Sequence, residues 1–216
     1  MSDIFDVVDE HDQVVRQEAR AEVHRQRLRH RAVHVLVFNA GGAVYLQRRS
    51  AQKDTYPLRW TTSCSGHVDA GEDYDTAVVR ELGEELGIAG TEVLRHQGTE
   101  HNMPTVGSSE ASSGLAGIQP SNIIKIEADQ GSPALPSSFI LHPLIKHPPC
   151  RETGWEFIWI YTLTTEAAPT PDPVEIAEGR WCGADELDAW MAREPKAFTP
   201  SFLLVWKLWR EKNGQN

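Results

Sequence analysis

The chain has little cysteine, no long apolar run and a deficit of positive charge. Its three cysteines, Cys64, Cys150 and Cys182, are odd in number and widely spaced, unlike a disulfide framework or a zinc site. No apolar run approaches the roughly 20 residues that span a bilayer, and the acidic start lacks the apolar core of a secretory signal. These absences predict a protein of the reducing cytoplasm.

The charge balance also limits the partners. Lys and Arg number 21 against 31 Asp and Glu, so the formal net charge is −10. This argues against a general nucleic-acid surface and against binding to an anionic membrane. It is compatible with a nucleotide-like substrate, because bound cations can invert the local field. We expect a small-molecule partner and leave a homodimer open.

With 216 residues and 40% hydrophobic content, the chain suits one domain with additions. We expect an N-terminal extension at 1–29, a main domain at 30–193 and a C-terminal helical segment at 194–216. Strands are expected at residues 4–8, 14–15, 32–38, 43–47, 92–96, 157–163 and 179–182. Helices are expected at residues 18–27, 76–86, 185–191 and 201–210. This order predicts an α+β fold, with a mixed sheet between helices.

One segment does not suit a compact domain. From 98 to 140, Gly, Ser and Pro supply 17 of 43 residues. Loops beyond about 12–15 residues are uncommon unless they are functional or disordered. We expect a flexible insertion between two strands, with local pairing at 123–126. A lid or partner-binding loop is the alternative.

The most specific pattern is Gly66-x5-Glu72-x7-Arg80-Glu81-Leu82-x-Glu84-Glu85-x-Gly87-Ile88. At average residue usage, all nine positions match a given start by chance roughly once in 10⁹ to 10¹⁰ trials. In a helix over 76–86, with Asp73 or Asp75 as cap and Gly87 as stop, the three glutamates share an arc of roughly 100°. Like charges at these spacings weaken a helix by about 0.2–0.5 kcal/mol per pair.

A hard divalent cation removes that cost, because Mg²⁺ prefers oxygen ligands. Glu81, Glu84 and Glu85 are therefore candidate metal ligands, and the alternative is an ordinary solvated acidic face. Glu72 is either a further ligand or a brace for the loop, through the backbone or through Arg80.

The pattern is that of the Nudix box, and the chain resembles the Nudix hydrolase family. The resemblance implies a Nudix fold and a Mg²⁺-dependent enzyme, with Mn²⁺ as a possible substitute, that cleaves a diphosphate linked to another group. It also implies structural roles for Gly66, Glu72, Arg80 and Gly87.

Outside the box, the chain is similar to type 1 isopentenyl-diphosphate isomerases and their hydrolase relatives. The matching stretches lie at 28–34, 47–57, 60–67, 154–157 and 198–200. His30, His67 and Glu156 match metal-site residues of the isomerases, whereas His24 does not align cleanly. The isomerases place a catalytic Cys where this chain has Ser65, and a second acid where it has Gly154. Cys64 lies one residue away and should point to the opposite side of an extended segment.

Three basic residues precede the box. Arg48, Arg49 and Lys53 are candidate diphosphate contacts, since Arg offers forked contacts and Lys a point charge. The alternative is solvated charge at a strand end. His67 is a candidate contact for substrate or metal, and the alternative, which is the more frequent role of a lone histidine beside a glycine, is a structural hydrogen-bonding residue.

These residues predict hydrolysis by attack of water at phosphorus. Glu84, Glu85 and Glu156 are the candidate catalytic residues, with Glu84 or Glu156 as the base. An isoprenoid-diphosphate isomerase and a non-catalytic diphosphate-binding module are the two alternatives. The substrate itself, a nucleoside diphosphate derivative or a related organic diphosphate, is not encoded in any readable motif.

Overall fold

A computed structural model describes residues 3–94, 123–124 and 139–214 of the chain. The helices are α1 Arg20–Gln26, α2 Tyr74–Leu86, α3 Ala184–Arg193 and α4 Pro200–Asn213, with a 3-10 turn at Pro195–Ala197. The strands are β1 Ile4–Val8, β2 Val14–Ala19, β3 His30–Phe38, β4 Val44–Arg49, β5 Trp60–Thr61, β6 Cys64–His67, β7 Thr91–Leu94, β8 Ile123–Ile124, β9 Phe139–His147, β10 Glu156–Thr164 and β11 Ile176–Cys182. Of the helices described, none is long and apolar enough to cross a membrane.

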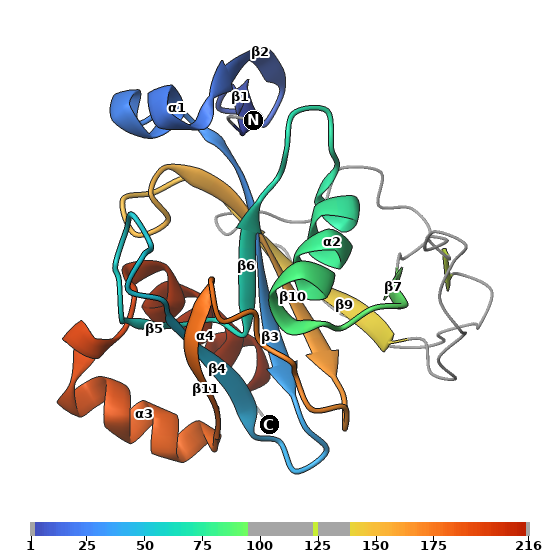
Figure 1. The fold of residues 1–216 in the computed structure, drawn as a ribbon, viewed down its shortest axis with the longest axis vertical. Helices are drawn as coiled ribbons and strands as arrows, with labels where there is room; N and C mark the ends of the chain where they lie inside the picture. The colour runs from blue at the N-terminus through green and yellow to red at the C-terminus, as the bar shows by residue number, and fades with distance from the viewer. Residues whose placement is uncertain (1–2, 95–122, 125–138, 215–216) are drawn as a thin grey trace.

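One mixed sheet forms the centre of the molecule (Figure 1). Over the described residues, the strand order is β11-β4-β3-β10-β9-β7-β8, with β5 paired to β4 and β6 to β3. Parallel pairing of β3 with β10 sets His30 opposite Glu156, and antiparallel pairing of β3 with β6 sets Ala32 opposite His67. This register brings the starts of β3 and β10 and the end of β6 to one end of the sheet.

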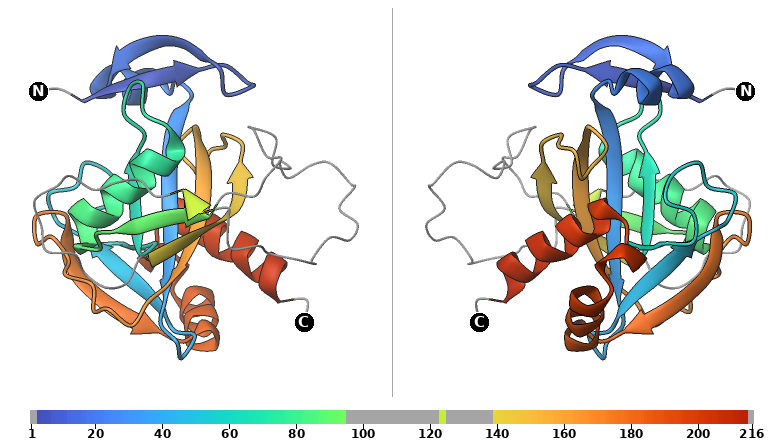
Figure 2. Two further views of the ribbon diagram at one scale, coloured as in Figure 1. Left: turned by 90° about the vertical axis from the view of Figure 1, so that its right-hand side faces the viewer. Right: turned by 90° about the vertical axis from the view of Figure 1, so that its left-hand side faces the viewer.

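Helices cover both faces of the sheet (Figure 2). Because side chains alternate along a strand, Val33 and Val35 of β3 face α2, whereas Leu36 faces α4. The predicted α+β fold with a mixed sheet between helices is confirmed. The apolar stripe of α4 packs against the sheet, as expected, through Phe202 and Val205, which are fully buried.

The N-terminal strands β1 and β2 form a separate two-stranded sheet at one end of the molecule (Figure 1). The buried Asp12 at the hairpin turn accepts hydrogen bonds from Arg31 Nε (2.6 Å), Tyr74 Oη (2.9 Å) and Lys146 Nζ (2.5 Å). These donors come from β3, α2 and β9, so they hold the hairpin, and with it α1, against the main sheet. The boundaries at 29/30 and 193/194 stay a prediction.

The ends of α2 follow the predicted signals, with one correction. Asp73 is the N-cap and accepts from Thr76 N at 2.7 Å, while Gly87 ends the helix at φ 64°, a left-handed conformation that suits glycine. Asp75, the other candidate cap, lies inside the first turn and accepts a hydrogen bond from Tyr161 Oη at 2.8 Å. The expectation for Asp75 was therefore wrong.

Strand β9 was not predicted. Pro143 lies inside it and lowers the strand signal, and β10 accommodates the proline by a register shift between Ile160 and Tyr161. Residues 139–140, placed at the end of the expected insertion, belong to β9. The predicted local pairing is confirmed at Ile123–Ile124, which pair with β7. Residues 98–122 and 125–138 of the expected insertion lie outside the described residues, and so do residues 95–96 of the expected strand at 92–96.

Candidate active site

The acidic face of α2 meets strand β6 at the first glycine of the box. Glu81 and Glu85 are largely buried, whereas the Glu84 side chain is 60% exposed. A Cβ at Gly66 would lie only 1.9 Å from Glu81 Cδ. Glycine at 66 thus lets the Glu81 carboxylate approach the strand backbone, which is a close contact that no other residue permits.

Arg80 balances this acidic face. Its guanidinium donates to Glu72 Oε1 (3.0 Å), to Glu81 Oε1 (2.6 Å) and to Glu84 Oε2 (3.2 Å). It also donates to the backbone oxygen of His67 at 3.0 Å. Glu72 accepts in turn from Asp69 N at 3.1 Å, so it braces the loop before α2. Of the two roles considered for Glu72, this geometry matches the brace.

Glu85 is held from the sheet. Its Oε2 accepts from Gln47 Nε2 of β4 at 2.9 Å and from Ser65 N of β6 at 3.1 Å. Burial raises the pKa of the Glu85 carboxyl, and these hydrogen bonds oppose the rise. Burial also raises the pKa of Glu81 to about 7, against the charge of Arg80. Two buried carboxylates with raised pKa values fit a divalent cation, which would favour their charged forms.

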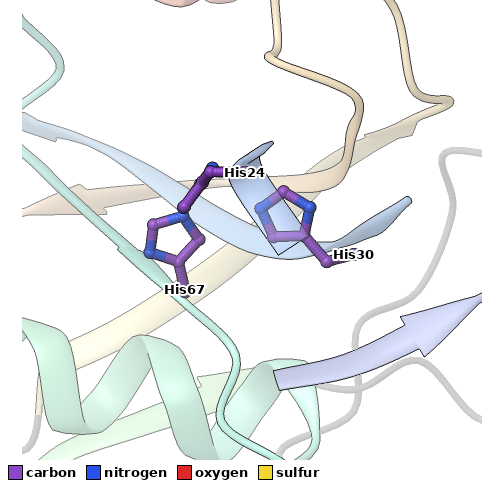
Figure 3. Close-up of side chains that lie close together, drawn as sticks. All are labelled: His24, His30 and His67. Atoms are coloured by element: carbon purple, nitrogen blue, oxygen red, sulfur yellow. The ribbon is translucent and has the colours of Figure 1, made fainter. Parts of the chain in front are cut away.

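A second cluster lies on the opposite side of β6. His24 of α1, His30 of β3 and His67 of β6 point toward one another (Figure 3), and one ring nitrogen from each lies within 4.8 Å of the others. Glu156 Oε1 at the start of β10 lies 3.4 Å from His30 Nε2 and 3.2 Å from His67 Nε2. Three imidazoles and a carboxylate form a donor set that suits a transition-metal ion.

The geometry of His30 supports that interpretation. Its Nδ1 lies 2.9 Å from Leu28 O, a carbonyl that can only accept, so Nδ1 carries the proton. Its Nε2 is buried and has no hydrogen-bond partner of acceptable geometry. A metal-ligating histidine has this arrangement, in which one nitrogen donates to the backbone and the other keeps a free lone pair.

The charges within the cluster are unequal. Burial raises the pKa of Glu156, but the electrostatic effect of the neighbouring imidazoles of His30 and His67 outweighs it and holds that pKa well below its usual range. The pKa of His24 is lowered by burial of its ring and by the neighbouring His67 and His30. The residue as a whole is exposed, but its ring packs edge-on against both histidines, with centroids 5.0 and 5.1 Å apart.

Of the predicted basic residues, Arg49 and Lys53 are influenced by the charges of the acidic groups, and their direct contacts lie elsewhere: Arg49 Nε donates to Thr55 O at 2.9 Å, and Lys53 forms an ion pair with Glu175. Arg49 is influenced by the charges of Glu85 and Glu156, and Lys53 by Glu85 and Glu81. Burial lowers the pKa of both side chains. Arg48 lies one residue along β4, on the other side, and donates to Leu58 O at 3.0 Å. The structure therefore does not bring Arg48 to the site.

Sequence reasoning missed two residues and left a third unassigned. Arg20 at the start of α1 contributes charge near Arg49 and Lys53. Gln47 contacts Glu85, although in the sequence it is only a polar strand residue. His24 did not align cleanly with the isomerase pattern, yet it completes the histidine cluster. Its position near an expected histidine of the isomerase pattern was the available signal.

Cys64 and Ser65 lie on opposite sides of β6. Cys64 is fully buried against the α2 side of the sheet, as predicted, and burial raises the pKa of its thiol well above the usual value. Ser65 pairs with His34 across the strands and shares the face of His67. The buried thiol is therefore not available to the histidine cluster.

Several known proteins are similar to this chain. The NUDIX domain model matches residues 28–114. The isopentenyl-diphosphate Delta-isomerase of Nocardia farcinica is 31% identical over 196 residues, which cover 90% of this chain and 87% of that protein. An uncharacterised Nudix hydrolase of a Nostoc species is 45% identical over 87 residues, which cover 40% of this chain and 52% of that protein. The match thus spans about half the length of that hydrolase.

A solved crystal structure has a similar fold. The crystal structure of DR0079 from Deinococcus radiodurans superposes with a TM-score of 0.65 at 25% identity, covering 96% of this chain and 99% of that one. The chain belongs to the Nudix family, in the class of hydrolases that act on diphosphate bonds. Within that family, it falls in the subgroup similar to the isopentenyl-diphosphate isomerases.

Proposed function

We propose that the chain hydrolyses the diphosphate linkage of a nucleoside diphosphate derivative or a related organic diphosphate, with Mg²⁺ or Mn²⁺ held by Glu81, Glu84 and Glu85. The observation that carries this proposal is a pair of glutamates one turn apart on α2 that are largely shielded from solvent: Glu85 is buried, and the Glu81 side chain is 12% exposed. A solvated acidic face would not bury two of its three carboxylates.

The basic side chains supply the complementary charge. Arg49, Lys53 and Arg20 would bind the non-bridging phosphate oxygens and orient the diphosphate toward the carboxylates. When bound, the cation offsets phosphate charge and makes a water molecule more acidic. Glu84, the most exposed of the three glutamates, would accept the proton of the attacking water. The water oxygen bonds to phosphorus, and the bridging P–O bond breaks with its electron pair on the leaving phosphate.

The histidine cluster would hold a second cation. Its residues fit such an ion through the unpartnered Nε2 of His30 and the adjacent carboxylate of Glu156. In this proposal, Glu156 and His67 lie beside that second cation, across β6 from the α2 carboxylates. Glu156 is the alternative base to Glu84, and His67 contacts the second metal in place of the substrate.

Isomerisation of an isoprenoid diphosphate is the second candidate. The N. farcinica relative is called an isopentenyl-diphosphate Delta-isomerase. His30 and His67 of the histidine cluster, with Glu156 beside them, resemble metal-site residues of that subgroup. Two positions argue against it. Ser65 replaces the reactive thiol, and a serine hydroxyl is a far weaker acid than a thiol of pKa about 8.5. Gly154 replaces the second acid.

A substrate screen tests these proposals. The purified protein is incubated with nucleoside diphosphate derivatives, dinucleoside polyphosphates and isoprenoid diphosphates, each with Mg²⁺ or Mn²⁺, and the products are separated by chromatography. Hydrolysis is expected to release phosphate or a monophosphate, with chelator abolishing it. Conversion of isopentenyl diphosphate to dimethylallyl diphosphate without phosphate release would replace the hydrolase proposal with the isomerase. Tight Mg²⁺-dependent binding of a diphosphate that is never cleaved would favour a binding module.

A further inference from the structure

Gln47 lies where strand β4 meets the acidic face of α2. Its side chain is buried, 3% exposed, and its Nε2 donates to Glu85 Oε2 at 2.9 Å. The two residues are 38 positions apart and belong to different layers of the fold. We propose that Gln47 is a positioning residue that fixes which oxygen of Glu85 faces a bound divalent cation. This inference rests on the proposed function.

Two donors converge on the same atom. Ser65 N, from strand β6, donates to Glu85 Oε2 at 3.1 Å, on the atom that Gln47 also contacts. A carboxylate oxygen that accepts two hydrogen bonds has its lone pairs engaged. Glu85 Oε1 would then be the oxygen left to coordinate a cation, with the orientation of the carboxylate set by the two donors.

The chemistry of the amide suits this role. An arginine or lysine in place of Gln47 would also donate to Glu85, but its charge would compete with the cation. A glutamate there would add a second buried anion and remove the donor. The neutral amide fixes the carboxylate and leaves its negative charge for the metal, in the way that neighbouring hydrogen bonds orient metal ligands generally.

Strand β4 also carries a candidate contact for the substrate, Arg49. Arg49 lies two residues after Gln47 on β4, so the two side chains share a face and their Cα atoms are about 6.6 Å apart. One strand therefore carries both the residue that orients a metal ligand and a cation for the phosphate. Register in the sheet couples the two positions, since shifting β4 by one residue would turn both side chains away.

Substitution of Gln47 tests the inference through metal binding. Gln47→Met keeps the length of the side chain and removes the donor, and Gln47→Glu replaces the donor with an acceptor. Mn²⁺ binding is followed by electron paramagnetic resonance, counting only the Mn²⁺ that Mg²⁺ displaces. This restricts the measurement to the oxygen-ligand site, because Mg²⁺ prefers oxygen ligands to imidazole.

We expect Gln47→Met to weaken that binding about tenfold to a hundredfold, the usual effect of removing a residue that orients a metal ligand. Gln47→Glu should weaken it further. Thr61→Val is the matched control. Thr61 is a buried polar residue opposite Gln47 on β5, and its hydroxyl contacts Thr199 (3.0 Å). It should lower the melting temperature without changing Mn²⁺ affinity.

The measurements distinguish failure of the positioning role of Gln47 from failure of the proposed function. Unchanged Mg²⁺-displaceable binding in both Gln47 variants, with native circular dichroism, would overturn the positioning role and leave the hydrolase proposal standing. Equal weakening in Thr61→Val would also overturn it, because any loss of packing would then have the same effect. If the wild-type protein binds no Mg²⁺-displaceable Mn²⁺, with or without a diphosphate, the proposed function fails and this inference fails with it.

Discussion

Two clusters of potential metal ligands lie on opposite sides of strand β6, and they are assembled in different ways. The carboxylates of the first cluster come from one helix, with Glu81, Glu84 and Glu85 within five consecutive residues. The second takes His24, His30, His67 and Glu156 from a helix and three strands. The first offers only oxygen atoms and the second mostly nitrogen. A local motif can therefore specify the first cluster, whereas the second depends on the whole fold.

The largest effect is expected at the contact that the first cluster makes with β6. Gly66→Ala would place a Cβ 1.9 Å from the Glu81 carboxyl carbon, so the glutamate must move. We expect diphosphate hydrolysis to fall by about a hundredfold or more, which corresponds to roughly 2.7 kcal/mol of lost transition-state stabilisation. Initial rates under saturating Mg²⁺ measure it.

The same substitution at Gly183 is the control, because nothing lies within 4 Å of a Cβ added there. Activity of Gly66→Ala within threefold of wild type would mean that the position of Glu81 does not matter for the reaction.

A different metal preference should separate the second cluster from the first. His30→Gln removes an imidazole, so Co²⁺ binding to the histidine cluster should weaken about tenfold to a hundredfold, measured by visible absorption. Mg²⁺-displaceable Mn²⁺ binding at the carboxylates should stay unchanged. His11→Gln, on an exposed side chain, is the control. Parallel loss of both metals would show that the two clusters are one centre.

The pH dependence of stability should reveal the first cluster without metal. Burial raises the pKa of Glu81 from 4.5 to about 7, so the folded state holds this proton more tightly than the unfolded state. Stability is therefore present below about pH 4.5 and is lost as pH rises toward 7, by about 1–3 kcal/mol. Urea unfolding in chelator measures it.

Glu81→Gln should flatten that slope, and Mg²⁺ should suppress it in the wild-type protein. The histidine cluster should change stability with pH in the opposite direction. The pKa of His24 is lowered in the folded state, so its contribution to stability is lost as pH falls. An unchanged slope in Glu81→Gln would assign the dependence to other groups.

The smallest effect is expected within α2 itself. Gly83 lies in the middle of the helix, and an added Cβ there meets nothing within 4 Å. Gly83→Ala should stabilise the protein by about 0.5–1 kcal/mol, because alanine favours helix. Thermal unfolding measures the change. Gly154→Ala, where φ is 70° beside Glu156, should destabilise instead. Destabilisation by both changes would indicate that α2 needs its glycine for flexibility.

The sequence predicted the parts that depend on short-range patterns. The Nudix helix, its Asp73 cap and its Gly87 stop follow from local propensity and were all found. The opposite directions of Cys64 and Ser65 follow from strand alternation. The Arg80–Glu84 contact follows from helix spacing.

Long-range contacts were the part that could not be predicted. Gln47 meets Glu85 only because the fold brings β4 to the buried side of α2, and no property of a lone strand glutamine signals that. His24 reaches the cluster only because the Asp12 contacts hold the N-terminal hairpin in place. Strand β9 was missed because Pro143 lowers the strand signal. The register shift in β10 that accommodates this proline is a tertiary feature, which the sequence does not reveal. The division of the chain into segments and the roles of the site residues stay predictions.

The most direct test is the dependence of hydrolysis on Glu85. Diphosphate cleavage is measured for wild type, Glu85→Gln and Glu211→Gln, the last being an exposed glutamate on α4. If the α2 carboxylates hold the catalytic cation, Glu85→Gln should lose at least about a hundredfold in kcat/KM, with Glu211→Gln unchanged. A loss of less than tenfold in a folded Glu85→Gln protein would contradict the assignment of the reaction to this face.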